Sequence, residues 1–88
     1  MRITFNTGKD RMNSDKHGVS LSLAARIDWS AVMAKPDQRR DYGEVREIGY
    51  AAVDQRLYCV VFTQRGETMH IISLRRANSR EVREYAKA

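Results

Sequence analysis

Two adjacent arginines, Arg75 and Arg76, carry the clearest chemical signal in the sequence. They follow an apolar stretch, residues 71–74, that has the pattern of a β-strand, and they precede a helix start. A strand end fixes the direction of a side chain, and a fixed guanidinium group is a good ligand for phosphate. The pair therefore predicts contact with a phosphodiester, so nucleic acid is the first partner to consider.

If these residues also act on RNA, a site without a metal ion needs a base for the ribose 2′-OH, a cation for the charge on phosphorus and an acid for the leaving 5′-oxygen. Arg75 and Arg76 are candidates for the cation. His17 is a candidate acid or base, because free imidazole titrates at a pH of about 6.5. If the strand continues to residue 76, the two arginines point to opposite faces, and only one lines a given groove. In the structural alternative, one arginine pairs with Glu81 or Glu84.

The other candidates also have structural interpretations. His17 precedes Gly18, where a helix end would favour its positive charge. Glu81 lies three residues after Asn78, the spacing of a capping carboxylate, and is otherwise a candidate base. Tyr85 shares a helical face with Glu81, and it can stack on a base, contact a phosphate or pack under the sheet.

Further basic residues are candidates for sequence-independent contacts with an RNA backbone. Arg46 lies two residues after Glu44, which predicts an ion pair within the sheet or a second phosphate ligand. His70 lies in the middle of an expected strand and is interpreted as structural. The RNA-binding candidates are Lys9, Lys16, Arg46, Arg65 and Arg80.

The composition fits one small basic domain. A chain of 88 residues has no room for a second independent core. The net charge is +5, and residues 56–88 hold 7 Lys and Arg against 3 Asp and Glu, which suits an anionic partner. The single cysteine, Cys59, lies in an apolar run, which excludes an internal disulfide and predicts a buried thiol.

Several classes of protein are not expected. The sequence has no cluster of metal-ligand residues and no glycine-rich phosphate loop, so neither a metal nor a cofactor is predicted. No apolar segment has the length of a signal peptide core or a membrane span. We therefore expect a cytoplasmic protein with no membrane partner.

The N-terminal half predicts one strand and two helices. Residues 2–6 alternate as a strand, and a polar helix over residues 8–16 is expected to begin at Thr7 with Asp10 and to end at Gly18. Ser20 has the features of the N-cap of a second, amphipathic helix. That helix is expected to end before Pro36, and the charged residues 35–43 are interpreted as the main loop.

The C-terminal half predicts a β-meander and a last helix. Strands are expected at residues 44–53, 56–64 and 68–75, and their short connections predict antiparallel neighbours. A helix over residues 79–87 follows, with Asn78 as its N-cap. The order β-α-α-β-β-β-α is that of an α+β domain with helices packed on an antiparallel sheet.

Several motifs, in this order, resemble those of BrnT-type toxins over nearly the whole chain. They are Lys16-His17-Gly18-Val19-Ser20, Ile48-Gly49, Val60-Val61-Phe62-Thr63, and Ile72-Ser73-Leu74-Arg75-Arg76-Ala77 with Glu81 and Tyr85 beyond. The resemblance implies a single RelE-like toxin domain over residues 1–88. It also implies the toxin half of a type II toxin–antitoxin pair, which cleaves RNA, arrests translation and is inhibited by a BrnA-type antitoxin.

The sequence thus predicts a metal-independent endoribonuclease toxin. Two other functions remain open. The first is a basic RNA-binding or regulatory module whose arginines only hold phosphates, and the second is an interaction protein whose basic face binds an acidic partner. The expected catalytic residues are His17, Arg75, Arg76, Glu81 and Tyr85.

Overall fold

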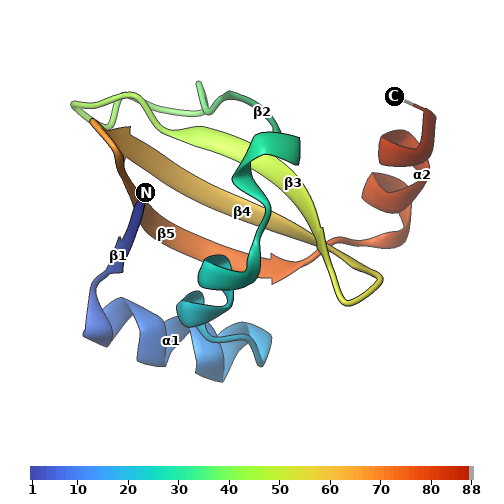
Figure 1. The fold of residues 1–88 in the computed structure, drawn as a ribbon, viewed down its shortest axis with the longest axis horizontal. Coiled ribbons are helices and arrows are strands. Elements are labelled where there is room, and N and C mark those ends of the chain that lie inside the picture. The colour runs from blue at the N-terminus through green and yellow to red at the C-terminus, as the bar shows by residue number, and fades with distance from the viewer. Residues whose placement is uncertain (88) are drawn as a thin grey trace.

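The protein folds into a five-stranded sheet with an α-helix near each end of the chain (Figure 1). The computed structural model describes residues 1–87. The strands lie in the order β1-β5-β4-β3-β2. The elements are β1 (Arg2–Phe5), α1 (Thr7–His17), the 3-10 helices η1 (Leu21–Arg26) and η2 (Trp29–Ala31), β2 (Met33–Pro36), β3 (Glu47–Val53), β4 (Arg56–Arg65), β5 (Thr68–Arg76) and α2 (Ser79–Lys87).

The expected meander is confirmed, because β4 pairs antiparallel with both β3 and β5. Asp54 and Gln55 join β3 to β4 with φ angles of 50° and 65°, the left-handed conformation that a two-residue hairpin turn needs. Gly66 supplies positive φ in the next turn. The strand expected from residue 44 begins only at Glu47.

The sheet is mixed, not purely antiparallel as expected, because β1 runs parallel to β5. Their register pairs Arg2 with Thr68 and Phe5 with Ile71, so β1 covers only the first half of the β5 edge. Beyond it, the Asn13 side chain donates to the Leu74 carbonyl at 2.7 Å and accepts from the Leu74 amide at 3.2 Å. The Asn13 side chain of α1 thus takes the place of a strand neighbour at Leu74.

The second α-helix expected after Ser20 is wrong. Ser20 does cap a helix, but the segment forms two short 3-10 helices and then strand β2. Asp28 accepts a hydrogen bond from the amide of Ser30, which starts a new turn and interrupts any continuous helix. The main loop therefore begins after Pro36, because residues 33–36 pair antiparallel with β3.

The first helix ends as expected and begins differently. Gly18 closes α1 with φ 69°, and its amide donates to the Ser14 carbonyl. The N-cap is Asn6, whose side chain accepts from the Lys9 amide, so the expected cap at Thr7 is wrong. Asp10 instead accepts from the Leu21 amide at 2.7 Å, which ties α1 to η1.

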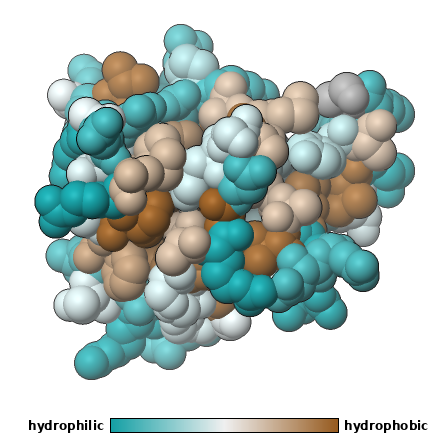
Figure 2. Space-filling model, in the orientation of Figure 1, coloured by the Kyte–Doolittle hydropathy of each residue, from teal (hydrophilic) through white to brown (hydrophobic). Residues whose placement is uncertain are grey.

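The main core lies between one face of the sheet and residues 19–32, which include η1 and η2, and Figure 1 shows the two 3-10 helices crossing this face. Trp29 packs edge-on against Phe62 with ring centroids 4.9 Å apart, so it belongs to this core. Figure 2, in the same orientation, shows patches of apolar residues on this face framed by hydrophilic ones. Residues with no exposed surface or almost none are Leu21, Ala24, Val60, Ile71 and Leu74.

Candidate functional site

We call the other face of the sheet the open face, and Arg75 is the catalytic candidate whose strand position places it there. Side chains alternate along a strand, so Cys59 points away from the core that Tyr58 and Val60 help to form. Cys59 pairs with Tyr50 on one side and with Arg75 on the other. The open face is defined by the cross-strand rows Tyr50–Cys59–Arg75 and Ile48–Val61–Ser73.

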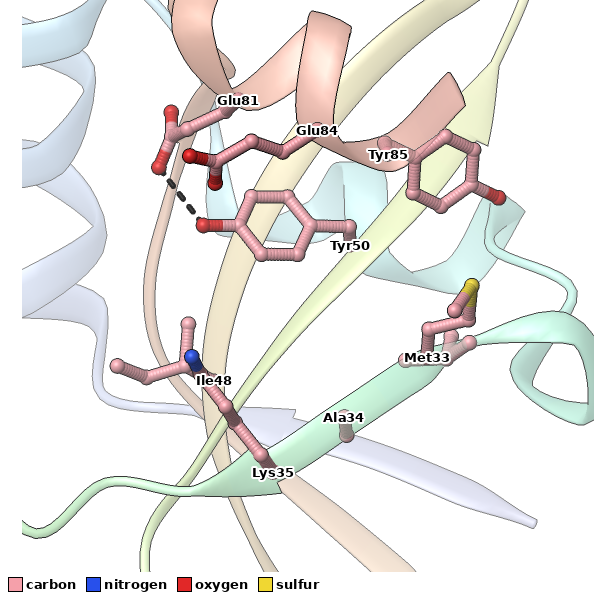
Figure 3. Close-up of a pocket in the computed structure, with 9 residues that line it drawn as sticks. Met33, Ala34, Lys35, Ile48, Tyr50, Glu81, Glu84 and Tyr85 are labelled. Carbon is pink, nitrogen blue, oxygen red and sulfur yellow. Dashed lines mark hydrogen bonds between the residues drawn. The ribbon is translucent and has the colours of Figure 1, made fainter. Parts of the chain in front are cut away.

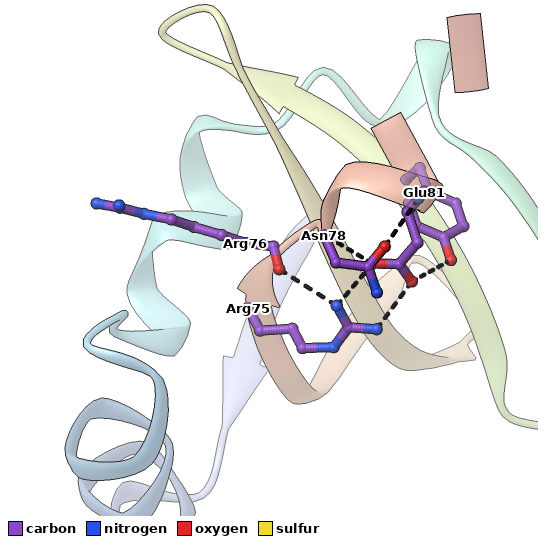
Figure 4. Close-up of polar contacts among 5 residues, drawn as sticks. Arg75, Arg76, Asn78 and Glu81 are labelled. Atoms are coloured by element: carbon purple, nitrogen blue, oxygen red, sulfur yellow. Dashed lines mark hydrogen bonds and ion pairs between the residues drawn. The ribbon is translucent and has the colours of Figure 1, made fainter. Parts of the chain in front are cut away.

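A hydrogen-bonded network joins the end of β5 to α2 on this face (Figure 4). The Arg75 guanidinium donates to the two carboxylate oxygens of Glu81 at 2.8 and 2.9 Å, and to the Arg76 carbonyl at 3.2 Å. Tyr50 donates its hydroxyl to Glu81 at 2.8 Å. Three of the five guanidinium N–H groups of Arg75 are therefore used, and two remain for a ligand.

Glu81 has the features of a positioning residue. It is the capping carboxylate predicted for α2, since it accepts from the Asn78 amide while Asn78 accepts from the Glu81 amide, each at 2.8 Å. The Arg75 hydrogen bonds, with the bonds from Asn78 and Tyr50, lower the pKa of Glu81 to about 2. A carboxylate that holds four hydrogen bonds and such a pKa is a poor base near neutral pH, so the geometry does not favour the catalytic role expected for it.

Arg75 and Arg76 point in different directions, as the strand pattern predicted. Figure 4 shows the Arg76 side chain extending away from the network that holds Arg75. Arg76 is exposed and lines a different groove, beside Leu57 and Val82. Of the two arginines, only Arg75 therefore lies on the open face.

His17 is the last residue of α1 and lies close enough to Arg75 to feel its charge. Partial burial lowers the pKa of the imidazole below its usual value of 6.5, and the positive charges of Lys16 and Arg75 lower it further. The ring is therefore mostly neutral at pH 7. It lines a groove of about 590 Å³ with Lys9, Lys16 and Ser73, between α1 and β5.

A second groove, of about 330 Å³, adjoins the first through Lys9 and Ile72. Arg46 and Arg65 both line it. The expected pair between Glu44 and Arg46 is wrong, because Glu44 binds Arg65 at 2.9 Å instead. Three of the predicted RNA-binding residues thus lie in this groove, whereas Arg80 is exposed on the first turn of α2.

His70 lines the same second groove, yet it is held by the sheet. Its Nδ1 lies 2.9 Å from the Thr4 hydroxyl of the neighbouring strand β1. This hydrogen bond is consistent with the structural role expected for His70.

A third groove, of about 550 Å³, lies between α2 and the strands β2 and β3 (Figure 3). Tyr85 and Glu84 line it from the helix, and Met33 and Lys35 line it from β2. Tyr85 is half-buried, and Figure 3 shows its ring beside this groove. It therefore lies on the far side of the Arg75 network from His17.

Two important residues were not singled out from the sequence. Tyr50 lies on β3 and donates a hydrogen bond to Glu81. In the sequence, only its spacing of two residues from Ile48 indicated that both side chains lie on the open face. Burial and the bond to Glu81 raise the pKa of its hydroxyl. Asn13 holds α1 against β5 by donating hydrogen bonds to the carbonyls of Val19 and Leu74. No local sequence pattern predicts this role, because the two carbonyls come close to Asn13 only in the folded chain.

The described residues contain no group of three or more His, Cys, Asp or Glu side chains placed to hold a metal ion. No helix among residues 1–87 is long and apolar enough to cross a membrane. Cys59 is a buried free thiol, as predicted, and burial raises its pKa.

The α+β fold thus combines an arginine held by a carboxylate with two adjoining grooves lined by basic side chains, an arrangement suited to an anionic ligand. The family model described as "Ribonuclease toxin, BrnT, of type II toxin-antitoxin system" matches residues 5–81. The chain therefore belongs to the BrnT family of ribonuclease toxins. Membership of this class implies RNA as the substrate and a cognate antitoxin as the partner.

Structural comparison agrees with the family assignment. The 1.1 Å crystal structure of the Brucella abortus ribonuclease toxin, BrnT, is similar with a TM-score of 0.69. The match covers 90% of this chain and 99% of that chain, at 21% sequence identity, and it shows a shared fold. No curated protein sequence matches the chain.

Proposed function

We propose that residues 1–88 form one RelE-like toxin domain that cleaves RNA internally, without a metal ion, and so arrests translation in the cytoplasm. A BrnA-type antitoxin would neutralise it by covering the open face. Membership of the BrnT family supports the toxin function. The remaining steps rest on the chemistry of the side chains on this face.

The observation that carries the proposal is that His17, in the groove between α1 and β5, lies within range of the positive charge of Arg75 on the same strand β5. A neutral imidazole is able to take the proton of a ribose 2′-OH, and a nearby guanidinium stabilises the charge that then develops on phosphorus. The lowered pKa of His17 keeps the ring in the basic form at pH 7. The Glu81 carboxylate holds the Arg75 fork in one orientation while two of its N–H groups stay available.

Other side chains have supporting roles in this proposal. Lys9, Lys16, Arg46 and Arg65 line the two adjoining grooves and would contact the RNA backbone. Tyr85 would stack on a base that enters the third groove. Arg76 and Arg80 lie outside these grooves, and in this proposal they only add to the positive field.

The test is cleavage of a defined RNA in EDTA, followed by analysis of the new ends. Attack by the 2′-OH leaves a 2′,3′-cyclic phosphate and a 5′-hydroxyl, and His17→Gln should abolish both products while it retains RNA binding. Cleavage that EDTA stops, or 5′-phosphate ends, would contradict the proposal.

A second function has one observation in its favour. Glu81 already neutralises Arg75, which suits a residue that only shapes a binding surface. If RNA binds to the pure protein and stays intact, the chain is a binding module and not a nuclease.

A further inference from the structure

The groove between the start of α1 and the far end of the β4–β5 hairpin has an unusual balance of charge. Basic side chains line much of it, and they are Lys9, Arg46, Arg65 and His70. Glu44 is the one carboxylate in the lining. A groove with this lining attracts an anion.

The Glu44 carboxylate already occupies this positive field. The Nη2 and Nε atoms of Arg65 donate to its two oxygens at 2.9 and 3.3 Å, as a fork would bind one edge of a phosphate. The hydrogen bond from Arg65 lowers the pKa of Glu44, and the charges of Arg65, Arg46 and His70 lower it further. Both partners remain partly exposed, so water and ligands reach the pair.

Arg46 adds a cation that forms no salt bridge within residues 1–87. Its guanidinium carbon lies 3.9 Å from the centre of the Tyr42 ring, and its Nε is buried without a hydrogen-bond partner. The Tyr42 hydroxyl donates to the buried Asp37 at 3.1 Å, which fixes the ring. Arg46 is thus held in place without a salt-bridge partner.

We propose that this groove is a subsite for a second phosphate of the RNA strand, and that Glu44 takes the place of that phosphate in the free protein. The inference rests on the proposed RNA-cleaving function. Residues 70 and 75 are five positions apart on one strand, roughly 16 Å, so the subsite does not hold the phosphate that lies at Arg75. RNA binding exchanges the Glu44 contact with Arg65 for a phosphate contact.

Binding of a 2′-O-methyl RNA oligonucleotide, measured by fluorescence anisotropy, tests the subsite, because this RNA lacks the nucleophile and is not cleaved. Glu44→Gln should tighten binding by about 3- to 10-fold at low salt, since it removes the competing carboxylate. The matched control is Glu67→Gln, which makes the same charge change at an exposed position outside the groove. It should change affinity by less than about 2-fold.

A double variant identifies the cause. In an Arg65→Gln background the gain from Glu44→Gln should disappear, because the contact that is exchanged no longer exists. An equal gain from Glu44→Gln and Glu67→Gln, or weaker binding by Glu44→Gln, overturns the subsite. Failure of the proposed nuclease function is distinguishable, since it appears as intact RNA in the cleavage assay while the binding result stands.

Discussion

Arg75 and Glu81 are joined by two hydrogen bonds, of 2.8 and 2.9 Å, that link the end of β5 to the first turn of α2. The same carboxylate caps the helix through the Asn78 amide. The helix cap therefore also orients the cation of the proposed site. A change at Glu81 should affect both the stability of the protein and the geometry of Arg75.

Glu81→Gln should destabilise the fold at pH 7 by about 2 kcal/mol, because it leaves part of a bidentate contact unmade. The pKa of Glu81 is lowered to about 2 from 4.5, so its ionic contribution is fully present above pH 4.5 and is lost as the pH falls towards 2. The difference between wild type and variant should therefore shrink below pH 4.5. Urea unfolding at pH 7, 5 and 3 measures it.

Glu84→Gln is the control for this experiment. Glu84 lies one turn further along α2, is exposed and forms no ion pair within the described residues. It should change the free energy of unfolding by less than about 0.5 kcal/mol at each pH. An equal loss of unfolding free energy in the two variants would show that the charge of α2 matters and the contact between Glu81 and Arg75 does not.

Arg75→Lys and Arg76→Lys provide a test of the two faces of β5. Lysine keeps the charge of arginine but lacks the planar fork of N–H donors. Arg75→Lys should therefore slow RNA cleavage by about 100-fold, the loss of rate that follows when one hydrogen-bond donor to the transition state is removed. Arg76→Lys should change the rate by less than about 3-fold, because its side chain extends from the opposite face. Comparable losses from both substitutions would argue against a site on the open face.

His17 should act as a base with a pKa below 6.5 in the free enzyme. Burial lowers the pKa first, and the charge of Lys16 lowers it further. Cleavage should therefore rise with pH through that pKa and level off near neutral pH. Lys16→Gln removes one cation and should raise the pKa of His17. The acidic limb of the pH–rate profile and the imidazole titration followed by NMR should then both move to higher pH.

Lys9→Gln is the matched control for this shift. Lys9 lies on the same helix and lines the same groove, but its charge does not contribute to the lowered pKa of His17. Lys9→Gln should leave the pKa of His17 unchanged. Movement of the pKa to lower values in Lys16→Gln would contradict the electrostatic explanation.

Asn13→Ala should cost about 2–3 kcal/mol of unfolding free energy, because it orphans the buried backbone groups of Leu74. It should also broaden or shift the NMR signals of His17, which lies one turn further along α1. Ser14→Ala removes only a 3.4 Å contact to the Val19 carbonyl and should cost less than about 1 kcal/mol. Wild-type stability in Asn13→Ala would show that α1 docks without this side chain.

The sequence by itself determined the elements that depend on local interactions. The alternating strands and short turns predicted β3, β4 and β5, Gly18 predicted the end of α1, and the Asn78 and Glu81 spacing predicted the cap of α2. The pattern at Arg75 and Arg76 also predicted that the two side chains would separate. Each of these depends on backbone conformation and hydrogen bonds among near neighbours in sequence.

Only the tertiary structure decided which distant residues meet. Residues 33–36 form a strand because they pair with the edge of β3, and β1 pairs in parallel with β5 although no sequence pattern predicted that register. Glu44 binds Arg65, 21 positions away, instead of its neighbour Arg46. Such contacts depend on packing between elements, which brings side chains together regardless of their spacing. For the same physical reason, the sequence pattern indicated Arg75 as a candidate, whereas only the fold shows that Glu81 holds it and that its charge acts on His17.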